Sequence, residues 1–61
     1  MEYKIEVTIT PDYNNSPICP YFWCILGRNG GDWHNCGHGW AKSPREAWRQ
    51  ACEYYDDITL I

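Results

Sequence analysis

The tetrapeptide Ser43-Pro44-Arg45-Glu46 constrains this chain more than any other stretch, because it fixes where a helix begins. Ser43 is a typical N-cap residue, Pro44 suits the first helical position, and Glu46 stands where a capping box requires an acidic residue. Apolar residues then recur at the spacing of one helix face: Ala47, Trp48, Ala51, Cys52 and Tyr55. We expect the helix to end near Asp56-Asp57, whose charges oppose the dipole at a helix C-terminus.

The residues before the helix predict three strands. From Tyr3 to Ile9, apolar residues alternate with polar ones, which is typical of a strand with one buried face. A polar loop rich in Asn and Pro follows at residues 11–20. Tyr21–Leu26 is a short run in which every residue is apolar. It predicts a strand with two apolar faces, each of which needs another element or chain packed on it. Asn29-Gly30 predicts a tight hairpin turn, and a third strand then runs from Asp32 to about Trp40.

This order of elements predicts an α+β fold, in which a three-stranded antiparallel sheet carries one helix on one face. The 61 residues form a single small domain, residues 1–61. A chain this short buries only about 60% of its unfolded surface. Its four Trp, five Tyr and one Phe are therefore the main source of buried apolar area. The tail Ile58–Ile61 could pack under the sheet, add a short edge strand or dock on another chain.

Charge and cysteine content bear on partners and location. Five basic residues stand against eight acidic ones, for a net charge of −3, which disfavours contact with phosphate along a broad face. The N-terminal residues are charged and alternating, unlike a signal peptide, and no apolar run approaches the length of a membrane span. We therefore expect a cytoplasmic protein, whose four cysteines are free thiols or ligands rather than disulfides.

A candidate metal site lies in the third predicted strand. His34, Cys36 and His38 would share one side of a strand, and Cys24 or Cys19 could supply a fourth ligand to zinc. Against this reading, the chain has no Cys-x-x-Cys pair, and glycines at positions 37 and 39 indicate a bulge or a close backbone approach. We favour the alternative, in which these residues are ordinary strand positions and the protein needs no cofactor.

Other chemical patterns are weaker. Cys36 beside a histidine lacks an evident orienting group and a cleft, so we expect no enzyme activity. The glycines at 27, 30 and 31 fit a hairpin turn rather than a phosphate-binding loop. Lys42, Arg45 and Arg49 cluster near the helix N-terminus and are candidate contacts for an anion or a nucleic acid. The alternative for these three is a solvated helix face.

The aromatic residues outnumber what one helix face can cover. Those left on the outer side of the sheet favour a protein partner or a homodimer, because Trp and Tyr are enriched at interaction hot spots. The candidate partner-binding residues are Tyr21, Trp23, Trp33 and Trp40. We expect them to act together with the Ile58–Ile61 tail.

Three segments together resemble the small HicB-like antitoxin domains of bacteria and phages: Tyr21–Ile25, Gly37–Ala41 and Ser43–Ala47. Those domains share a partial double-stranded-RNA-binding-like β-β-β-α fold. In that family, a glycine near the end of the third strand precedes a Thr or Ser cap, an acidic residue and an alanine at the start of the helix. The matching residues here are Gly39, Ser43, Glu46 and Ala47.

The chain departs from the family pattern in three ways. The family usually has a Gly-Cys pair just before the third strand, whereas here the cysteine lies inside that strand. Gly39 and Ser43 are further apart than in the family, and no C-terminal DNA-binding domain follows within these 61 residues. The resemblance implies the fold, and a regulatory domain that dimerises or binds a protein.

Overall fold

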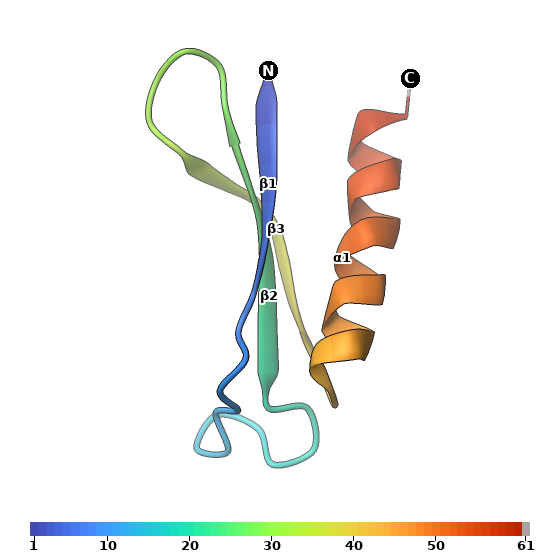
Figure 1. Ribbon diagram of the computed structural model, residues 1–61. Helices are drawn as coiled ribbons and strands as arrows, with labels where there is room; N and C mark the ends of the chain where they lie inside the picture. Colours follow the sequence, from blue (N-terminus) through green and yellow to red (C-terminus); the bar gives the residue numbers. More distant parts are fainter. Residues whose placement is uncertain (61) are drawn as a thin grey trace.

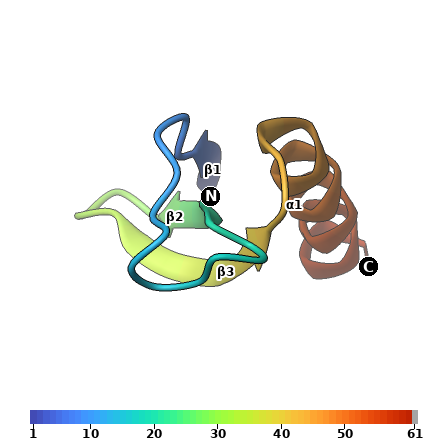
Figure 2. The ribbon, with the colours of Figure 1, turned by 90° about the horizontal axis from the view of Figure 1, so that it is seen from below.

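The computed structural model describes residues 1–60 and contains three antiparallel strands followed by one helix (Figure 1). The elements are β1 (Glu2–Val7), β2 (Tyr21–Arg28), β3 (His34–Ala41) and α1 (Pro44–Thr59). The strands lie in the order β1-β2-β3, and α1 packs along one face of the sheet (Figure 2). The predicted α+β fold is confirmed. Within residues 1–60, no helix is long and apolar enough to cross a membrane.

The core lies between the sheet and α1 and is made of few residues. Trp23 and Ile25 of β2 and three alanines are buried there: Ala41, Ala47 and Ala51. The Trp23 indole lies over Gly39, where an added Cβ would come within 2.7 Å of the ring. Its Nε1–H donates to Gln50 Oε1 of α1 at 3.0 Å. The bulk of one indole is thus accommodated by small residues in β3 and α1.

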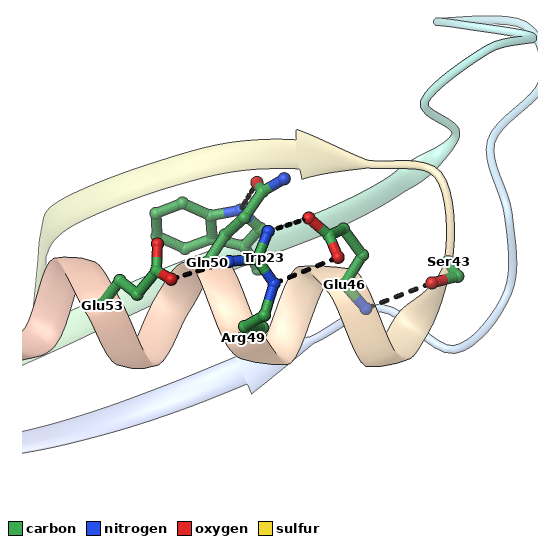
Figure 3. A network of polar contacts seen from close by, with 6 residues as sticks. All are labelled: Trp23, Ser43, Glu46, Arg49, Gln50 and Glu53. Carbon is green, nitrogen blue, oxygen red and sulfur yellow. Dashed lines mark hydrogen bonds and ion pairs between the residues drawn. The ribbon is translucent and has the colours of Figure 1, made fainter.

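The helix begins where the sequence predicts. Ser43 has an extended backbone, and its Oγ accepts a hydrogen bond from the Glu46 N–H at 3.1 Å. The capping box is only half formed, because the Glu46 carboxylate bonds to Arg49 instead of returning to Ser43 (Figure 3).

The predicted end of α1 near Asp57 is wrong, since the helix continues to Thr59. Ile58 packs against the core, and the Thr59 hydroxyl donates to the Tyr55 carbonyl at 2.7 Å. Residues 58 and 59 therefore form a helical turn rather than an added strand. Ile61 lies outside the described residues.

The predicted apolar face of the helix is also wrong in one respect. The residues of α1 that belong to the core or pack against it are Ala47, Ala51, Tyr55 and Ile58. Trp48 is 53% exposed and lies on the flank of α1, next to Cys52 in a shallow groove. The small side chains of Ala47 and Ala51 let this face of α1 lie close to the sheet. The adjacent face of the helix, which carries Trp48, therefore stays outside the core.

The two connections between strands differ in kind. β1 ends at Val7 rather than at the predicted Ile9, which is 82% exposed. The loop that follows is closed at its base by the Asp12 N–H, which donates to the Pro20 carbonyl at 2.8 Å. The hairpin between β2 and β3 is confirmed, but its connection is a five-residue loop, residues 29–33, and the predicted tight turn at Asn29-Gly30 is wrong. Gly30 has a φ of +78°, and Asn29 does not have a positive φ.

Candidate functional site

A β-bulge interrupts the third strand. Ile25 stands opposite Gly37 and Leu26 opposite Asn35, so no residue of β2 is paired with Cys36. An extra residue of this kind changes which side the following residues face. Cys36 packs on the helix side, near Gly27 and against the core cluster, whereas His38 lies opposite Cys24.

The bulge overturns the expectation that His34, Cys36 and His38 share one side of a strand. Among residues 1–60, no three His, Cys, Asp or Glu side chains lie close enough together to hold a metal ion. Cys19, the other candidate ligand, lies in the loop before β2, where its N–H bonds to Ser16 Oγ at 3.0 Å.

The cysteines are free thiols throughout. Burial raises the pKa of the Cys24 thiol, and the nearby Glu6 carboxylate raises it further, although Lys4 acts in the opposite direction. A raised pKa keeps this thiol protonated at neutral pH. Cys24 is therefore a poor nucleophile.

The basic residues near the helix N-terminus do not form one free cationic cluster. Arg49 bonds to Glu46 and also to Glu53, with an Nη1–Oε1 distance of 2.7 Å (Figure 3). The hydrogen bond from Arg49 lowers the pKa of the Glu46 carboxyl. Lys42 and Arg45 are exposed. The candidate anion site thus contains two carboxylates as well as its cations.

The side of the sheet opposite α1, here called the outer face, carries a second group of aromatic side chains. Side chains alternate along a strand, so Phe22 and Leu26 point away from the core that holds Trp23 and Ile25. The Phe22 ring lies 5.0 Å from Trp40 and 6.1 Å from His38, between centroids. These contacts join β2 to β3 by an aromatic cluster on the outer face.

Charged side chains lie at the other end of the outer face, around Trp33. Lys4 Nζ and Arg28 Cζ each lie 4.6 Å from the Trp33 ring centroid, at a distance typical of cation–π contacts. Arg28 also pairs with Glu2 at 3.2 Å, and Lys4 with Glu6 at 3.6 Å. The outer face therefore has an aromatic cluster at one end and paired charges at the other.

The structure divides the four candidate partner-binding residues between two sides of the sheet. Trp33 and Trp40 belong to the outer face. Trp23 is 5% exposed in the core, and Tyr21 packs against the same core, so their predicted place on the outer side of the sheet is wrong. Ile58 also lies on the helix side, away from the outer face.

Sequence reasoning missed Phe22 and Leu26 as outer-face residues. The signal was present, because positions 22, 24 and 26 alternate with positions 21, 23 and 25 along the second strand. Both sets are apolar, so the sequence did not indicate which one faces the helix.

Comparison of the chain with models of protein families, with curated proteins and with solved structures gives no significant match.

Proposed function

We propose that this domain is a non-catalytic regulatory module that binds a protein partner through its outer face. The observation that carries the proposal is the cluster of Phe22, Trp40 and His38 on the side of the sheet that α1 does not cover. Aromatic side chains at the centre of an interface supply most of its binding energy. A domain with one helix leaves such a face available.

The charged residues of the outer face agree with this role. Protein interfaces combine an apolar centre with a polar border. Here Lys4, Arg28 and their acidic partners lie around Trp33, at the other end of the outer face from the aromatic cluster, and each cation already has a carboxylate beside it. Paired charges of this kind favour a polypeptide over the phosphate backbone of a nucleic acid, which requires unpaired cations.

The resemblance to HicB-like antitoxin domains supports the same proposal, because it implies dimerisation or protein binding. Four free thiols fit a reducing compartment, and we place the protein in the cytoplasm. The raised pKa of Cys24 supports a role without covalent catalysis.

The test compares two tryptophans on different surfaces. Trp40→Ser and Phe22→Ser alter the outer face, and Trp48→Ser alters an exposed tryptophan on α1 as the matched control. Each variant is immobilised, and proteins retained from a lysate of the source organism are quantified by mass spectrometry. Circular dichroism checks that each variant is folded.

We expect a partner that the parent chain and Trp48→Ser retain equally and that both outer-face variants lose by at least about tenfold. A partner retained equally by Trp40→Ser and Phe22→Ser would contradict the proposal. So would a partner lost only with Trp48→Ser.

A further inference from the structure

The two edges of the sheet are built differently. β3 is interrupted by the bulge at Cys36, and bulges are one way in which proteins prevent an edge from pairing with another chain. β1 pairs with β2 in an unbroken register from Glu2 to Val7, and no proline lies within it. A regular edge strand presents unpaired N–H and C=O groups to a neighbouring strand.

The hydrogen bonding of Thr8 shows which groups of β1 point outward. Thr8 lies opposite Phe22, one position beyond the Val7–Trp23 pair, and its N–H donates to the Phe22 carbonyl at 2.8 Å. In an antiparallel pair, residues alternate between those bonded to the neighbour and those whose groups point away. The N–H and C=O groups of Tyr3, Ile5 and Val7 therefore point to the free edge.

Side chains along β1 follow the same alternation. Tyr3, Ile5 and Val7 are half-buried on the helix side, whereas Lys4 and Glu6 are exposed on the outer face. α1 packs mainly on β2 and β3, so the apolar side of β1 is only partly covered. In Figure 2, β1 forms the edge of the sheet away from β3.

We infer that β1 is a dimerisation edge, which pairs antiparallel with β1 of a second copy of this chain. The two-fold axis passes beside Ile5, so that Ile5 faces Ile5 and Tyr3 faces Val7 on the helix side. Lys4 then faces Glu6 of the second copy on the outer face, twice by symmetry. The product is a continuous six-stranded antiparallel sheet that carries both helices on one side.

Charge and hydrogen bonding select this register over its neighbours. An axis beside Lys4 places Lys4 against Lys4 and Glu2 against Glu6, and an axis beside Glu6 places Glu6 against Glu6. Like charges directly opposite each other destabilise a strand pair, and opposite charges stabilise it. A shift by one residue fails for another reason, because it sets outward-pointing groups against groups already bonded to β2.

Charge exchange tests the register directly. Lys4→Glu and Glu6→Lys each turn both attractive pairs into repulsive ones, so each single variant should weaken the dimer by about tenfold or more. The two changes move the net charge in opposite directions, so an effect of net charge alone would have opposite signs. The double variant Lys4→Glu/Glu6→Lys restores opposite charges and has the composition of the parent chain, so it should dimerise like the parent.

Mixing the two single variants gives a further outcome that follows from the pairing. Positions 4 and 6 are then both acidic in the Lys4→Glu chain and both basic in the Glu6→Lys chain. Each of the two contacts therefore pairs opposite charges, so a heterodimer should form where neither variant dimerises alone. Sedimentation velocity and native mass spectrometry measure these species. Thermal unfolding of each variant checks that the fold remains.

Amide hydrogen exchange distinguishes a dimer formed through the β1 edge from a dimer formed through any other surface. In the dimer, the amides of Tyr3, Ile5 and Val7 should be protected in a concentration-dependent way, whereas those of Lys4 and Glu6 are protected already in the monomer by β2. A parent chain that stays monomeric at millimolar concentration would overturn the inference. A dimer in which Ile5 exchanges freely, or which the double variant fails to restore, would overturn it equally.

The inference depends on the β1 edge and not on the partner proposed for the outer face. Trp40→Ser should leave the dimer unchanged, so failure of one proposal does not imply failure of the other.

Discussion

Replacement of Gly39 by alanine tests how tightly the Trp23 indole packs against β3. An added Cβ would lie 2.7–2.8 Å from three atoms of the Trp23 indole, closer than real Cβ contacts allow. Trp23 is 5% exposed and held by its hydrogen bond to Gln50, so it cannot move aside without breaking that bond. Overpacking costs about 1–3 kcal/mol and the lost hydrogen bond about 1 kcal/mol.

We therefore expect Gly39→Ala to lower the free energy of unfolding by about 2–4 kcal/mol, a large part of the stability of a domain this size. Urea unfolding monitored by circular dichroism measures it. Two other glycines serve as controls. At Gly37 the obstacle is the Tyr54 ring, which is 39% exposed and can turn into solvent, so that variant should lose less. At Gly31 nothing lies within 4 Å of an added Cβ, so Gly31→Ala should be neutral or slightly stabilising.

The ranking of these three variants is what can refute the reasoning. If Gly39→Ala stays within about 0.5 kcal/mol of the parent chain, the indole is not wedged against β3. If Gly31→Ala loses as much as Gly39→Ala, the cost reflects the glycine backbone and not the packing of Trp23.

Two further predictions concern the helix start and the outer face. Ser43→Ala removes the acceptor for the Glu46 N–H and should cost about 1 kcal/mol in urea unfolding; no change would mean that the cap is unimportant. Folding raises the pKa of the Cys24 thiol, so the contribution of this thiol to stability is present below the pKa that it has in the unfolded chain. That contribution is lost as the pH rises through the pKa of the thiol in the folded protein. Glu6→Gln removes the carboxylate charge that helps to raise this pKa, so more of the thiol is ionised. The variant should therefore speed alkylation of Cys24 by iodoacetamide at mildly alkaline pH, as measured by peptide mass spectrometry. An unchanged rate would show that Glu6 does not act on this thiol.

The fold could be predicted from the sequence because its signals are local. Alternation in the first strand, the Asn29-Gly30 signal for a hairpin and the Ser43-Pro44 helix start each depend on a few neighbouring residues. The sides of the second strand could not be assigned in this way. Trp23 and Phe22 are adjacent aromatic residues, and only the position of α1 decides that the first is core and the second is outer face.

The end of the helix shows how competing energies mislead a sequence argument. Acidic residues near a helix C-terminus cost about 0.3–1 kcal/mol each when exposed. Complete burial of an isoleucine side chain stabilises by about 1.5–3 kcal/mol, and Ile58 obtains part of this by packing against the core. Asp56 and Asp57 are exposed, so their effect is at the low end of its range. The tertiary contact is stronger, and the helix continues to Thr59.

The candidate metal ligands do not share one side of the third strand, for a reason that lies in the register of the sheet. A spacing of two residues places side chains on one side only while a strand remains regular. Glycines at 37 and 39 indicated either a bulge or a close approach, and both are present: the bulge falls at Cys36, and Trp23 and Tyr54 lie over the glycines. The extra residue sends Cys36 toward the helix and leaves His38 beside Phe22 on the outer face. The same irregularity leaves β1 as the regular edge of the sheet, where a second copy of the chain can pair.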